Sequence, residues 1–144
     1  MAPVESKHLV RFSTQALSAY RRAQTTASSP ERGVGDAYDR MAGRLDEIEA
    51  ALREKTHRQI GPLIEQVWLG VFFITSLLDG SRNPDIVTQI KALNLFVMTR
   101  LARARRSGLP EDVRGVSGVL RKLHELFLTL DLAKQRGRGG EEND

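Results

Sequence analysis

Four successive segments of this chain carry apolar residues at steps of three and four, and breaks rich in glycine and proline separate them. Such spacing places the apolar side chains of a segment on one face of an α-helix. No segment shows the alternation of apolar and polar residues that is typical of a half-buried strand. The four stripes are Val34, Tyr38, Met41, Leu45, Ile48 and Leu52; Ile60, Ile64, Val67, Val71, Ile74 and Leu78; Ile86, Ile90, Leu93, Val97, Leu101 and Ala104; and Val113, Val116, Leu120, Leu123, Phe127 and Leu130.

Long amphipathic helices with short connections pack most simply as an antiparallel bundle. We therefore predict an all-α fold, an antiparallel four-helix bundle with an additional short N-terminal helix or segment at about Thr14–Ala27. A chain of 144 residues is long enough for one domain with a real core. The predicted helical domain covers residues 1–134, of which 1–13 form an irregular lead-in. Residues 135–144, rich in arginine, glycine and acidic groups, are predicted to be disordered.

Local signals place the ends of the helices. Either Ser28 or Ser29 can cap a helix that has Pro30 in its first turn, where the missing N–H of proline costs nothing. Pro84 opens the third stripe and Gly108 suits the end of that helix. The last helix is expected to start at Pro110.

The second and third helices have more apolar surface than one core requires. Leu69, Phe73 and Leu77 are spaced by four along a side that differs from the core stripe, and Leu95 and Met98 are spaced by three. Surplus apolar surface of this kind indicates a protein-binding face. The alternative is that a further segment of the chain, such as residues 9–20, packs over it.

Signatures of catalysis are missing from the sequence. It has no GxxxxGK[ST], GxGxxG or HExxH motif and no cysteine, and His8, His57 and His124 fall in separate elements. We therefore expect no catalytic, cofactor-binding or metal-binding residues, and a protein that is not an enzyme.

Charge and hydropathy favour a cytoplasmic protein without membrane insertion. The longest apolar run, Trp68 to Leu78, is eleven residues, whereas a bilayer span needs roughly 20. The net charge is +4, and its densest cluster is Arg100, Arg103, Arg105 and Arg106. Cations suit the C-terminal end of a helix, so this cluster favours a solvent-exposed helix end over a nucleic-acid site.

Three segments resemble the FlaF family of alphaproteobacterial flagellar biosynthesis regulators. The first runs from Ala19 to Glu31 and contains Tyr20 and the helix-starting Pro30, and the second is Trp68 with the apolar run after it. The third and most specific is Asn94-Leu95-Phe96-Val97. The resemblance covers about residues 19–130.

This resemblance implies a cytoplasmic chaperone that binds flagellin, at a terminal amphipathic helix, and is needed for flagellin synthesis, export and filament assembly. Other flagellar regulators are further candidate partners. The alternative is a post-transcriptional regulator that acts on flagellin mRNA, directly or through a partner. A homo-oligomer that buries the surplus apolar faces is a third interpretation.

Two residues of the resembling segments carry structural expectations. Trp68 is expected to be mostly buried. Asn94, flanked by leucines in a buried helix, must find hydrogen-bond partners, because an unpaired buried amide costs roughly 1–3 kcal/mol. Those partners lie either in a neighbouring helix or loop or in the bound protein.

Overall fold

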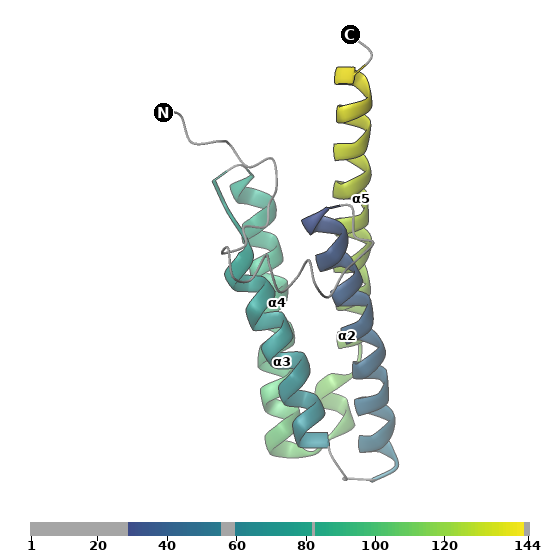
Figure 1. The fold of residues 1–144 in the computed structure, drawn as a ribbon. Coiled ribbons are helices and arrows are strands. Elements are labelled where there is room, and N and C mark those ends of the chain that lie inside the picture. The colour runs from purple at the N-terminus through teal and green to yellow at the C-terminus, as the bar shows by residue number, and fades with distance from the viewer. Residues whose placement is uncertain (1–28, 56–59, 82, 143–144) are drawn as a thin grey trace.

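The computed structural model describes residues 29–55, 60–81 and 83–142, and every element within them is helical. The elements are α2 (Pro30–Arg53), α3 (Ile60–Leu77), α4 (Pro84–Ser107), the 3₁₀ turn η1 (Pro110–Val113) and α5 (Val116–Glu142). Successive helices run in opposite directions, and α5 extends past the others at one end (Figure 1). Each helix lies beside its neighbours in the order α2, α3, α4, α5, and α2 packs along most of its length on α5. The predicted all-α antiparallel bundle is thus confirmed. The predicted helix at residues 14–27, which includes Tyr20, lies outside the described residues.

The caps of α2 and α4 follow the sequence signals. Ser29 is the N-cap of α2, and its Oγ accepts a hydrogen bond from the Arg32 N–H at 3.1 Å. Asn83 caps α4 through its Oδ1. Gly108 ends α4 in the left-handed region at φ 67°, and its N–H donates to the Ala104 carbonyl at 2.8 Å. Polar caps satisfy backbone groups that have no partner within the helix.

The predicted start of the last helix at Pro110 is wrong. Residues Pro110–Val113 form the 3₁₀ turn η1, and α5 begins only at Val116. Gly115 stands between them at φ 76°, a conformation that redirects the chain and that residues with a Cβ rarely adopt. Val113 is buried all the same.

The backbone of α5 is helical to Glu142, across most of the segment for which the sequence favoured disorder. Before that segment, Lys134 Nζ pairs with Glu31 Oε1 of α2 at 2.7 Å, and Asp131 accepts a hydrogen bond from Ser29. Through these contacts α5 stays packed on α2 as far as Lys134. The domain boundary at 134 stays a prediction.

One core cluster spans all four helices. The predicted stripes of α2 and α3 are buried throughout, and that of α5 is buried except for the partly exposed Leu130. In α4 the predicted stripe differs at two positions: Leu93 is 39% exposed, whereas its neighbour Asn94 is 0% exposed. Val87 is also buried, while the predicted Ile86 is only partly so. The other predicted positions of α4, Ile90, Val97, Leu101 and Ala104, are buried.

Among the described helices, α3 is long and apolar enough, by length and composition, to cross a membrane. Core helices of globular proteins have the same composition. One face of α3, from Ile60 to Ile74, is buried against the other helices, and its opposite face carries the exposed Glu65 and Gln66.

Candidate partner-binding surface

Large exposed apolar side chains of the described residues concentrate on α3 and α4. Each of them is between 39% and 64% exposed. They are Leu69, Phe72 and Phe73 on α3 and Leu93, Leu95 and Phe96 on α4. Two more, Leu109 and Leu132, lie elsewhere. Soluble proteins rarely gather so many large apolar side chains on one pair of helices unless a partner covers them.

The register between α3 and α4 decides which of these side chains share a surface. Asn94 Nδ2 donates to Thr75 Oγ1 at 3.0 Å, and Trp68 lines the same pocket as Ala102. Because the two helices are antiparallel, these pairings place Phe72 of α3 opposite Met98 of α4. Thus one apolar strip follows the line of contact between the two helices.

We call this strip the seam surface. It consists of Trp68, Leu69, Phe72, Leu95, Met98 and Ala102. Trp68 and Phe72, one turn apart, stack with ring centroids 5.5 Å apart and planes inclined by 6°. Stacked rings present a flat apolar surface that loses little side-chain freedom when a partner covers it.

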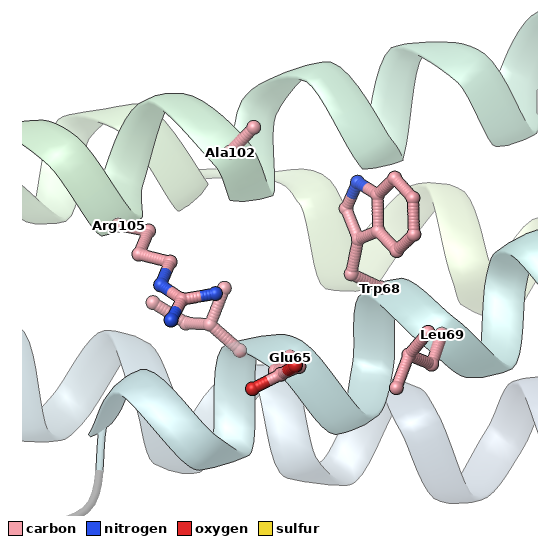
Figure 2. Close-up of a pocket in the computed structure, with 6 residues that line it drawn as sticks. Glu65, Trp68, Leu69, Ala102 and Arg105 are labelled. Atoms are coloured by element: carbon pink, nitrogen blue, oxygen red, sulfur yellow. The ribbon is translucent and has the colours of Figure 1, made fainter.

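A pocket of about 310 Å³ opens at one end of the seam surface, between α3 and α4. Its lining residues are Ile64, Glu65, Trp68, Leu69, Ala102 and Arg105. Figure 2 shows the Trp68 indole directed from α3 toward α4, while the Arg105 side chain extends from α4 toward α3. A second pocket of about 170 Å³ shares Ile64 and Arg105 with the first, so Arg105 borders both.

Of the predicted partner-binding residues, the structure brings three together. Leu69 and Leu95 are exposed, at 51% and 64%, and Met98 is partly buried and packs against the core cluster. The prediction for Leu77 is wrong, since this side chain is 7% exposed and belongs to the core cluster. It occupies the last turn of α3, where the chain folds back toward α4.

Phe73 is exposed as predicted but lies on another side of α3. Gln66, two turns before it on the same side of the helix, accepts a hydrogen bond from Arg44 of α2 at 2.7 Å. A Cβ at Gly70 would approach the Met41 sulfur of α2 to 2.8 Å. The side of α3 that carries Phe73 therefore borders α2, away from the seam with α4.

Sequence reasoning missed Phe72 and Arg105. A signal for Phe72 existed in its spacing of four from Trp68, which places two aromatic side chains on one side of a helix. The spacing of four that links Leu69, Phe73 and Leu77 does not keep these side chains on one side of α3. They range from the seam to the core. No comparable signal marked Arg105, because its position depends on how α4 meets α3.

Trp68 packs against the core cluster with most of its surface buried, as expected, and a smaller part of it stays accessible. Of the other residues in the resembling segments, Pro30 opens α2 and Val97 is 0% exposed. Phe96 is 47% exposed, and the Arg100 guanidinium lies over its ring at 5.8 Å.

Asn94 joins three helices through hydrogen bonds. The Tyr38 hydroxyl of α2 donates to Asn94 Oδ1 at 2.7 Å, and the Asn94 amide donates to Thr75 of α3. Thr75 in turn donates to the Val71 carbonyl at 2.8 Å. Burial raises the pKa of Tyr38 well above its usual range, more than the bond to Asn94 lowers it. Because Asn94 is fully buried, its partners are the neighbouring helices and not a bound protein.

The α2–α5 interface is held by polar contacts at the bundle surface. Arg121 of α5 donates to Asp46 of α2, and this bond holds the pKa of the Asp46 carboxyl below its usual value. His124 Nδ1 donates to the Gly35 carbonyl at 2.7 Å. Within the described part of the chain, no three histidine, aspartate or glutamate side chains gather as a metal site would require.

Comparison of the chain with family models, with curated proteins and with solved structures finds no match.

Proposed function

We propose that this protein is a cytoplasmic flagellin-binding secretion chaperone of the FlaF type, which covers an amphipathic terminal helix of flagellin with its seam surface. The observation that carries the proposal is the cluster of exposed apolar side chains along the contact between α3 and α4. The resemblance of the segments at Trp68 and Asn94–Val97 to the FlaF family supplies the identity of the partner.

The physical argument concerns helix-in-groove binding. An amphipathic helix laid along two packed helices buries its apolar stripe in the depression between them. Each large apolar side chain that is fully buried contributes roughly 1.5–3 kcal/mol. Covering the exposed parts of Trp68, Leu69 and Phe72 therefore favours the complex, and the entropy lost on association offsets part of this gain.

The test is co-expression with the flagellin of the same organism, followed by purification of the complex. Leu69→Glu places a charge on the seam surface, and Leu132→Glu makes the same change on α5 at a leucine of similar exposure, 54% against 51%. We expect Leu69→Glu to lose flagellin and Leu132→Glu to retain it, with unchanged helical circular dichroism in both. Retention of flagellin by Leu69→Glu would place the binding site elsewhere.

Light scattering separates this proposal from the homo-oligomer. A chaperone gains the mass of flagellin on binding, whereas a homo-oligomer has a multiple of 16.1 kDa by itself and becomes monomeric with Leu69→Glu. Binding of the isolated protein to flagellin mRNA, weakening steeply with salt, would instead support direct action on the message.

A further inference from the structure

Arg105 lies at the seam surface without an ionic partner among the residues that the structure describes. It lines the Trp68 pocket and the smaller pocket beside it. It forms no ion pair with a described carboxylate, including Glu65 in the same pocket lining. Its neighbours in the pocket are otherwise apolar: Ile64, Trp68, Leu69 and Ala102.

The helix dipoles at this end of the bundle do not neutralise the charge of Arg105. The C-terminal end of α4 carries about −0.5 of a unit charge. The N-terminal end of α3 lies at the same end of the bundle and carries about +0.5, with no acidic residue in its first turn (Figure 1). Because these two partial charges offset each other, the helix dipoles leave the positive charges of Arg105, Arg103 and Arg106 on α4 unneutralised.

We infer that the helix bound at the seam surface is acidic, and that it places an apolar side chain in the Trp68 pocket and a carboxylate about one turn away on Arg105. This inference rests on the proposed function and specifies the chemistry of the partner. A guanidinium can bind a carboxylate through two parallel hydrogen bonds, which fixes position as well as adding attraction. Glu65 projects from α3 into the same pocket lining. Because like charges repel, it favours placement of the partner's carboxylate on the α4 side of the pocket.

The experiment uses three designed helical peptides of about 18 residues, which is long enough to follow α3. All carry the same leucine stripe and the same hydrocarbon staple, so that their helicity is matched. The residues that flank the stripe are glutamate, glutamine or lysine. Affinities for the full-length protein are measured by fluorescence anisotropy at low salt.

We expect the glutamate peptide to bind the wild-type protein about fivefold more tightly than the glutamine peptide, the effect of one partly exposed ion pair. Arg105→Glu should abolish this preference and make the lysine peptide the tighter ligand. The control is Arg136→Glu, the same charge change on an exposed arginine near the C-terminal end of α5. That end of α5 lies opposite to the end of the bundle where α3 begins (Figure 1). It should leave the order of the three peptides unchanged.

The outcomes distinguish this inference from the proposed function. Equal binding of all three peptides that is lost with Leu69→Glu would overturn the role of Arg105 and retain the seam surface. Equal effects of Arg105→Glu and Arg136→Glu would show attraction by net charge alone and would also overturn it. If none of the peptides binds, the inferred partner chemistry is wrong, while co-purification with flagellin independently decides the proposed function.

Discussion

Asn94 is the residue that most constrains the packing of α4, because its amide both accepts from Tyr38 and donates to Thr75 in the core. We expect Asn94→Leu to lower the free energy of unfolding by about 1–3 kcal/mol, since it leaves a buried hydroxyl without its acceptor. Urea denaturation measures this. In a double-mutant cycle, Tyr38→Phe should cost about 1 kcal/mol less in the Asn94→Leu background than in the wild-type protein. Additive effects of the two substitutions would contradict this coupling.

Tyr38 also makes stability depend on alkaline pH. Its pKa is raised in the folded chain, chiefly by burial, whereas an unfolded tyrosine ionises near pH 10. The stabilising contribution is therefore complete below about pH 10 and is lost as pH rises above it, because only the unfolded chain then releases the proton. Urea midpoints should fall more steeply above about pH 10 in wild type than in Tyr38→Phe. Parallel curves for the two proteins would exclude Tyr38 as the cause.

On the scale of elements, Gly35 of α2 permits the close approach of α2 to α5. A Cβ at Gly35 would lie 3.3 Å from Phe127 Cβ and 3.5 Å from the His124 carbonyl oxygen, whereas a Cβ at Gly43 of the same helix would meet nothing within 4 Å. Alanine at an exposed helical position is roughly 1 kcal/mol more favourable than glycine. We expect Gly43→Ala to raise the thermal midpoint and Gly35→Ala to lower it, because Phe127 Cβ is fixed to the backbone of α5. A stabilising Gly35→Ala would mean that α5 moves outward at little cost.

On the scale of the whole molecule, one core cluster includes buried residues from every described helix. A single core of this size is typical of cooperative, two-state unfolding. Trp68 is the only tryptophan in the chain, so its fluorescence reports on the α3–α4 seam, while circular dichroism reports on all helices. We expect the two signals to give the same urea midpoint. An earlier transition in fluorescence would show that the α3–α4 pair opens before α2 separates from α5.

The sequence alone determined the helices and most of the core. The repeat of apolar residues at steps of three and four reflects the geometry of a single helix, and the caps at Ser29 and Gly108 involve residues at most four apart. Such local relations can be read without knowing what packs on the helix. Every residue of the stripes predicted for α2 and α3 is therefore buried in the structure.

Only the tertiary structure decided which of the surplus apolar residues lie in the core and which face solvent. Leu77 and Leu69 belong to one predicted row, yet the first is in the core and the second faces solvent, because the angular width of the buried face depends on the neighbouring helices. The burial of Asn94 in place of Leu93 likewise depends on its hydrogen-bond partners in other helices. These are Thr75 and Tyr38, and Tyr38 is 56 positions away in sequence. The position of Arg105 beside Trp68 also depends on the antiparallel register of α3 and α4, which no local pattern specifies.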